Sequence, residues 1–329
     1  MNTPLWAIEK GWSAWRGRSR LSILIYHRVL PAPDPMRPGE PDVRRFDRQM
    51  EILAHHTHVL PLPEAVARLE AGTLPPRATA VTFDDGYADN YHHALPILRR
   101  HGIPATFFIA TGYLNDGWMF NDTVIEAVRW APDGTLDLTP QGLGRHRLDD
   151  MAGRRRAAEA IIRAVKHLTP PVRNACVEAV TRHAGAPAPE RLMMTDDEVR
   201  GLHEAGMTIG AHTVSHPILT LVDERQARWE IHESAERLRA ICRAPVECFA
   251  YPNGKPGRDY TARDRSLLRQ AGFRLAVSTA HGAAAPGRDP YQLPRFTPWD
   301  RAPWRFLIRL ALNSGHDGAL AHSGAHSGS

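Results

Sequence analysis

Two short polar motifs hold the residue types that metal-dependent hydrolysis uses. Asp84 and Asp85 directly follow an apolar run, and His212 and His216 stand four residues apart after another apolar run. Adjacent carboxylates at a strand end point in different directions, so one can bind a metal ion while the other faces a substrate. Two histidines at this spacing can converge on one ion. One aspartate and two histidines would leave coordination positions open for water and a carbonyl oxygen.

Each motif is a weak signal when it is taken alone. An Asp-Asp-Gly sequence is more often a turn or a helix cap, and a chain with 18 histidines contains some close pairs by chance. The position of both motifs after predicted strands favours a common site, because the carboxyl ends of parallel strands meet at one rim. The three cysteines contain no close pair that would complete a structural zinc site. We therefore expect a catalytic divalent ion, with zinc as the first candidate.

Apolar runs alternate with amphipathic helical patterns along most of the chain, which is typical of βαβ units and a mainly parallel sheet. The expected strands are 21–26, 80–83, 105–110, 207–211, 247–251, 273–278 and 291–296, and the main helices are 43–55, 91–101, 195–206, 223–242 and 261–271. This number of strands exceeds what an open sheet needs. The predicted fold class is α/β, with a distorted (β/α)7-type barrel.

The barrel domain is expected to span residues 21–313, with one interruption. Residues from about 118 to 194 contain arginine- and alanine-rich helical stretches without a strand pattern, which predicts a helical insertion. Residues 1–20 are expected to form an amphipathic N-terminal segment. The Gly-, Ser- and His-rich segment 314–329 predicts a disordered tail.

The sequence TFDDGY (Thr82 to Tyr87), followed by HTVSHP (His212 to Pro217), resembles the polysaccharide deacetylase family, also called the NodB-homology family or carbohydrate esterase family 4. The resemblance covers roughly residues 21–296. It implies a distorted barrel and hydrolysis of the N-acetyl group of an amino sugar. It also implies that Asp84 is the general base and that Asp85, His212 and His216 bind the metal ion.

Two further motifs of the family match only in part. In the stretch 249–254, Ala250 stands where the family has an arginine that orients the base, and Asn253 stands where it has an aromatic residue. Tyr251, Pro252 and Asn253 are still expected beside the substrate, because a backbone N–H of Asn253 can stabilise an oxyanion without a particular side chain. The last motif normally carries a catalytic histidine. Here the corresponding residues are Leu293, Pro294 and Arg295.

These departures lead to two hypotheses about the missing groups. Arg295 ends the last predicted strand near the first one, so we expect its guanidinium to pair with Asp84; the alternative is an ordinary surface arginine. His27, at the end of the first strand, and His281 are candidates for the general acid. Either histidine can equally have only a structural role.

The charge distribution bears on partners and location. The formal charge is +5, but the basic residues are scattered over helices, so a nucleic-acid partner is not expected. The N-terminus lacks the pattern of a signal peptide, which predicts a cytoplasmic protein. The tryptophan- and arginine-rich segment 1–20 and the stretch 303–312 can make peripheral contact with a membrane, or can pack on the domain itself.

The expected substrate is the N-acetylated amino sugar of a polysaccharide, an oligosaccharide or a lipid-linked glycan precursor. Two alternatives use the same residues. One is a related amidohydrolase or deformylase that acts on another amide. The other is a non-catalytic carbohydrate-binding protein. The absence of the family's arginine and catalytic histidine suggests this alternative.

Overall fold

A computed structural model describes residues 19–115, 117–185, 191–298 and 300–315. Its centre is a sheet in the order β1-β3-β4-β7-β8-β9, with β2 paired to β3. Every pairing in this sheet is parallel. The strands are β1 (Ser22–Tyr26), β2 (His58–Val59), β3 (Ala78–Phe83), β4 (Ala105–Ile109), β7 (Thr208–Ala211), β8 (Cys248–Ala250) and β9 (Leu275–Val277). The predicted α/β class is confirmed.

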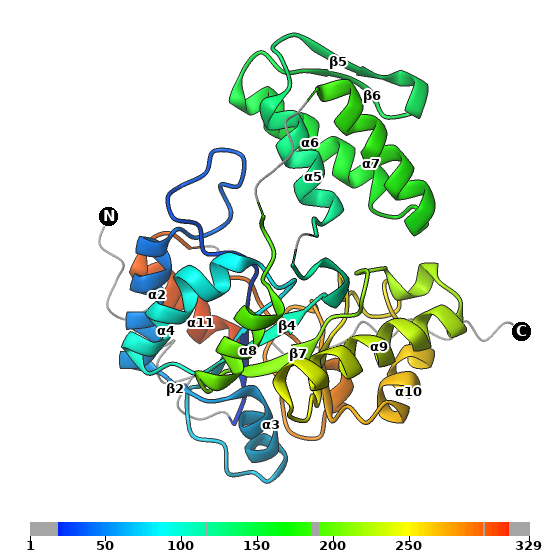
Figure 1. The fold of residues 1–329 in the computed structure, drawn as a ribbon. Coiled ribbons are helices and arrows are strands. Elements are labelled where there is room, and N and C mark those ends of the chain that lie inside the picture. Colours follow the sequence, from blue (N-terminus) through cyan, green and yellow to red (C-terminus); the bar gives the residue numbers. More distant parts are fainter. Residues whose placement is uncertain (1–18, 116, 186–190, 299, 316–329) are drawn as a thin grey trace, which may run out of the picture.

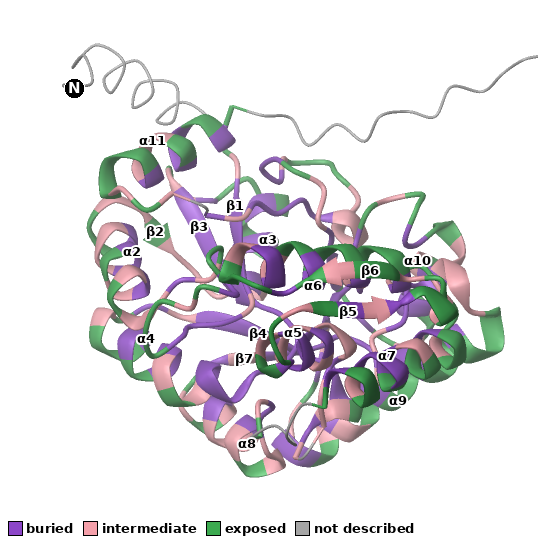
Figure 2. Cartoon of the chain, turned by 90° about the horizontal axis from the view of Figure 1, so that it is seen from above, coloured by how far each residue is buried: buried purple, intermediate pink, exposed green. Residues whose placement is uncertain are grey.

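Helices cover the outside of this sheet (Figure 1). They are α2 (Val43–His56), α4 (Leu95–His101), α8 (Asp196–Glu204), α9 (Glu224–Cys242), α10 (Ala262–Gln270) and α11 (Pro303–Asn313), and a π-helical turn, Asn90–Ala94, leads into α4. Figure 2 shows β1, β3, β4 and β7 largely buried, whereas the surrounding helices carry both buried and exposed residues. Helix α8 begins with a capping box formed by Thr195 and Glu198.

The sheet curls into a partial barrel. Alternate strand residues, including Ile23, Ala80, Phe108 and Cys248, meet in one apolar cluster, which shows that they share the inner face. Helix α3 (Leu62–Glu70) adds its buried side chains to this cluster. It closes the barrel at the end opposite the insertion (Figure 1).

Residues 291–296 do not form the predicted regular strand, although they lie beside the neighbouring strands where that strand was expected. The chain makes a 3-10 turn at Pro290–Gln292. It then forms two separate parallel bridges, from Leu293 to Val277 of β9 and from Phe296 to Leu24 of β1. Pro294 lies between the bridges and has no N–H to donate, so a continuous ladder of backbone hydrogen bonds cannot form there. This irregular segment joins the two ends of the curled sheet and carries Arg295 between them.

The insertion is not entirely helical, contrary to the prediction. It consists of α5 (Phe120–Trp130), β5 (Thr135–Leu138), β6 (Gly144–Arg147), α6 (Met151–Val165) and α7 (Pro170–Ala184). Strands β5 and β6 form an antiparallel hairpin. The elements share a core of their own and form a lobe above the barrel (Figure 1). The polar β6 sequence, Gly-Arg-His-Arg, has no apolar alternation by which a strand could be recognised.

The two chain ends were only partly predicted. Most of segment 1–20 and most of the tail lie outside the described residues. Ser314 was expected to begin a disordered tail, but it is buried and its hydroxyl donates to the carbonyl of Ala311. Helix α11 buries Phe306 and Leu310 and leaves Trp304 and Leu312 exposed. Within the described residues, no helix is both long and apolar enough to cross a bilayer.

Candidate active site

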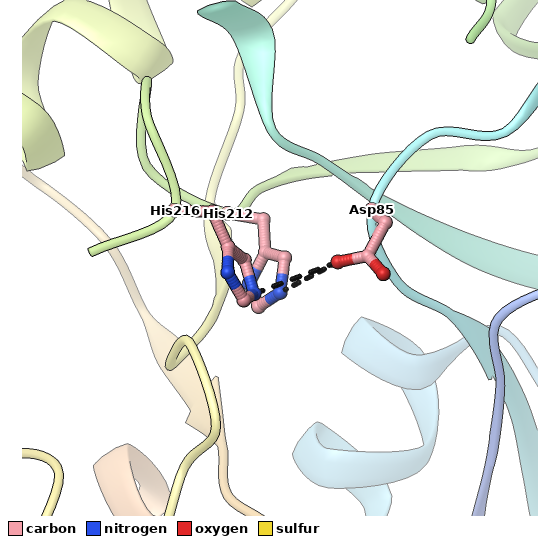
Figure 3. Close-up of side chains that lie close together, drawn as sticks. All are labelled: Asp85, His212 and His216. Carbon is pink, nitrogen blue, oxygen red and sulfur yellow. Dashed lines mark ion pairs between the residues drawn. The ribbon is translucent and has the colours of Figure 1, made fainter. Parts of the chain in front are cut away.

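Asp85, His212 and His216 converge at the carboxyl ends of β3 and β7 (Figure 3). The Nε2 atoms of both histidines lie 3.5 Å from the same oxygen, Oδ1 of Asp85. One potential ligand atom from each residue falls within 4.8 Å of the others. Oδ1 is buried and has no hydrogen-bond partner among the described residues. A buried carboxylate oxygen without a donor, facing two imidazoles, fits a divalent cation.

Both imidazoles turn Nε2 towards Asp85. Burial would lower the pKa of His212, but Asp85 and Asp84 outweigh this effect and raise it. Nδ1 of His212 lies 2.7 Å from the carbonyl oxygen of Ala250, which can only accept, so Nδ1 carries the proton and Nε2 stays free for a metal ion. Burial and the neighbouring His212 lower the pKa of His216 to about 3. Burial would raise the pKa of Asp85, but His212 and His216 outweigh this effect and lower it. The carboxylate is therefore ionised at neutral pH.

Three residues of the two motifs have backbones in the left-handed region. The φ angles are 78° for Asp85, 67° for Thr213 and 51° for His216. This region is unfavourable for residues other than glycine and is frequent at functional sites. The hydroxyl of Thr213 accepts a hydrogen bond from the backbone N–H of His216, which fixes the turn. The histidine pair therefore sits in a tight loop and not on a helix.

Glu230 of α9 fixes this loop through hydrogen bonds, a role that sequence reasoning missed. Its carboxylate accepts hydrogen bonds from the backbone N–H groups of Val214 and Ser215, both at 2.8 Å, and from the hydroxyl of Ser215. The side chain is 1% exposed. The available signal was an acidic residue on the buried face of an amphipathic helix, beside Ala227 and Ile231. Such a residue needs buried donors, and these are provided by the histidine loop.

Arg295 and Asp84 form a buried, bidentate ion pair beside the metal-binding residues. Nη1 and Nη2 of the guanidinium each donate a hydrogen bond to one oxygen of the carboxylate, both at 2.7 Å. The guanidinium also donates to the carbonyl of Ser278 and the hydroxyl of Thr82. Burial would raise the pKa of Asp84, but Arg295 and His212 lower it. Each carboxylate oxygen keeps a lone pair, so the ionised Asp84 can still accept a proton.

A cavity of about 490 Å³ unites most of the predicted site residues. Its size is within the usual range for small-molecule pockets, about 300–1,000 Å³. Pro252 is not among the residues that line it. Lining residues that the sequence predicted are His27, Asp84, Asp85, His212, His216, Tyr251, Asn253, His281 and Arg295.

The stretch after β8 forms one wall of this cavity. The hydroxyl of Tyr251 donates to the carbonyl of Tyr291, and its ring stacks on Tyr260 with centroids 3.6 Å apart. Asn253 has a φ of 58° and its carbonyl accepts a hydrogen bond from Thr279. Gly254 has a φ of 71°, and a Cβ there would lie 3.0 Å from backbone atoms of Tyr251 and Thr279, so another residue would be strained at this position. The oxyanion role of Asn253 stays a prediction.

The insertion lobe forms another part of the cavity wall. Met119, Phe120 and Asn121 at the start of α5 and Ile162 and Lys166 around the end of α6 line the same cavity. The lobe is fixed to the barrel side by a buried pair in which Arg37 donates to Asp122 at 2.9 Å. The lobe therefore borders the space in which a substrate would bind.

The known proteins that this chain is similar to agree with this geometry. A model of the polysaccharide deacetylase family matches residues 71–276, which include both motifs. YxkH of Bacillus subtilis, whose name places it among polysaccharide deacetylases, is 20% identical over 292 residues, covering 87% of this chain and 75% of YxkH. The poly-beta-1,6-N-acetyl-D-glucosamine N-deacetylase of Staphylococcus aureus is 36% identical over 73 residues, only 22% of this chain and 25% of that enzyme.

Two solved structures share the fold. IcaB from Ammonifex degensii aligns with a TM-score of 0.60 and 20% identity, covering 89% of this chain and 97% of that one. The Streptococcus pyogenes deacetylase PplD, solved in complex with acetate, aligns with a TM-score of 0.59 and 19% identity, covering 89% and 98%. At this level of identity, the alignments establish the curled parallel sheet and its distorted barrel.

Proposed function

This chain belongs to the polysaccharide deacetylase family, and on that premise we propose that it is a metal-dependent hydrolase that removes N-acetyl groups from amino-sugar residues of a glycan. The observation that carries the proposal is the placement of an ionised, arginine-paired Asp84 in one cavity with the Asp85, His212 and His216 ligand set. A protein that only bound carbohydrate would gain nothing from this arrangement.

In this proposal Asp85, His212 and His216 hold the divalent ion. When bound, such an ion lowers the pKa of a water molecule and polarises a carbonyl group. Zinc stays the first candidate. Another divalent metal would also fit this site, because oxygen and imidazole ligands do not discriminate sharply among metals.

The chain's own residues then provide proton transfer and orientation. Asp84 accepts a proton from the attacking water while Arg295 holds its carboxylate in place. The backbone N–H of Asn253 donates to the oxygen that becomes negative. The carbon–nitrogen bond breaks, the acetyl group leaves as acetate, and the amine takes a proton. His27, which lines the cavity, is the proposed donor of that proton.

Within this function, the glycan is a polysaccharide, an oligosaccharide or a lipid-linked precursor. The cytoplasmic location and a peripheral membrane contact stay predictions. The exposed Trp304 and Leu312 of α11 are the described residues that support such a contact.

The test is acetate release from a panel of free, oligomeric and lipid-linked N-acetylated sugars, with metal-loaded protein. Asp84→Asn serves as the matched inactive variant. Acetate that appears with the wild-type chain and is lost with Asp84→Asn supports the proposal. Release of formate from N-formyl sugars without acetate from any N-acetyl sugar would instead identify a deformylase. Sugar binding without release of either acid would indicate a binding protein.

A further inference from the structure

The corner between α6 and α7 holds two cationic side chains near the active site, and neither has a carboxylate within ion-pair distance among the described residues. They are Lys166, the residue at the C-terminal cap of α6, and Arg173, in the first turn of α7. Both belong to the insertion lobe, which contributes none of the proposed catalytic residues. A lobe that covers a catalytic cavity and brings charge to it can act on substrate choice.

Arg173 is a buried charge without a matched partner. It is 4% exposed, and its Nε has no hydrogen-bond partner. Its guanidinium carbon lies 4.5 Å from the ring centroid of Phe120, which lines the cavity. Glu230 attracts the guanidinium of Arg173 electrostatically. Its carboxylate, however, already accepts a hydrogen bond from the backbone N–H of Ser215. A buried cation that lacks a counter-ion is costly, so an anion at this place would be stabilising.

Lys166 lines the cavity directly, together with Ile162 one turn earlier. Within the part of the chain that the structure describes, its ammonium group makes no hydrogen bond or ion pair. Burial lowers its pKa; Asp259 opposes that effect, whereas Lys255 and Arg258 add to it, and the net result is a lowered pKa. Asp259 is itself engaged, since it accepts from the backbone N–H of Lys255. Lys166 thus faces the cavity without a carboxylate partner among the described residues.

From these contacts we propose that the insertion lobe recognises an anionic group, a carboxylate or a phosphate, on the glycan whose acetyl group is removed. Lys166 binds the group directly, and Arg173 contributes a buried positive field behind Phe120. The inference rests on the proposed deacetylase function and names its substrate class. Ammonium and guanidinium groups form charge-assisted hydrogen bonds with both kinds of anion.

The test compares three acetylated oligosaccharides of equal length, one neutral, one with a uronic acid and one with a phosphate. For the wild-type chain, kcat/KM should be higher for an anionic member than for the neutral one. The carboxylate and phosphate members distinguish which anion is preferred. In Lys166→Gln, the ratio of anionic to neutral kcat/KM should fall by roughly tenfold, the size expected for one charge-assisted hydrogen bond. In Lys166→Glu it should fall further, and in Lys166→Arg it should recover.

Arg163→Gln is the matched control, because Arg163 lies on the exposed side of α6 and should leave the ratio unchanged. Equal kcat/KM for neutral and anionic members, or a ratio unaffected by Lys166→Glu, would overturn the inference. Binding of the same oligosaccharides, measured by calorimetry, separates the two proposals. Absence of acetate from every member would defeat the deacetylase function. Anion-selective binding that depends on Lys166 would still uphold the recognition site.

Discussion

Arg295 donates two hydrogen bonds of 2.7 Å to Asp84, although the two residues are 211 positions apart in the sequence. The pair is buried, with side-chain exposures of 0% and 4%. In the sequence, Ala250 occupies the place of the arginine that orients the base in this family. The geometry places a guanidinium from a different segment on the same carboxylate, so we expect Arg295 to replace the missing arginine.

Arg295→Ala should lower kcat/KM for deacetylation by roughly 100-fold or more, the usual scale for loss of acid–base catalysis. The kcat/KM of Arg295→Lys should lie between those of Arg295→Ala and the wild type, since one ammonium group cannot hold both carboxylate oxygens. Steady-state acetate release measures both. Because the alanine variant leaves a buried carboxylate unpaired, thermal unfolding must accompany the assay. Undiminished turnover in Arg295→Ala would rule out the orienting role.

Removal of the metal ion should abolish activity, and one added divalent ion per chain should restore it. Addition of zinc at about 100 times its dissociation constant should stabilise the apo-protein by about 2.7 kcal/mol, because an ion that binds only the folded state shifts unfolding by mass action. Differential scanning calorimetry measures this. His216→Ala should lose most of the shift. A shift of equal size in that variant would place the ion elsewhere.

Glu230→Gln should weaken metal binding by about 10- to 100-fold, the range found when the support of a metal ligand is removed. The amide keeps the size of the side chain but brings an N–H group against the N–H donors of Val214 and Ser215. Competition with a metal-binding dye measures the affinity. Glu233→Gln is the control on the exposed face of the same helix. Equal affinities in the two variants would show that the histidine loop needs no such support.

Arg37→Ala should loosen the insertion lobe without removing any proposed catalytic group. Arg37 pairs with the buried Asp122 and with Glu126 of α5. Breaking a buried pair costs about 3–5 kcal/mol, so hydrogen exchange of residues 120–130 should accelerate. Arg48→Ala, which removes an exposed pair with Glu51, is the control. Unchanged exchange in Arg37→Ala would mean that the lobe is held by its apolar contacts.

Much of the barrel could be predicted because its strands are apolar runs with clear ends. Asp84, Asp85, His212 and His216 could be found since each motif directly follows such a run. The strand 291–296 was misjudged because Pro294 interrupts its ladder, a local effect that an apolar pattern does not reveal. The hairpin of β5 and β6 is too polar to show alternation.

Other features depend on contacts between distant segments. The helical pattern around Glu230 indicates a buried carboxylate but does not show that its donors lie in a loop 15 residues earlier. Likewise, the composition of the insertion does not show that Lys166 lines the cavity. Both follow from how α9 and α6 pack against the rest of the chain. Tertiary packing therefore decides which charged residues belong to the site.

The most direct test of the central claim is to measure acetate and free amine together, from one N-acetylated oligosaccharide treated with metal-loaded protein. Hydrolysis of the amide must release the two in equal molar amounts, and Asp84→Asn should release neither. Acetate without a matching amine would mean that the acetate does not come from the amide. That result, or full release by Asp84→Asn, would contradict the assignment of this chain as an N-deacetylase that uses Asp84 as its base.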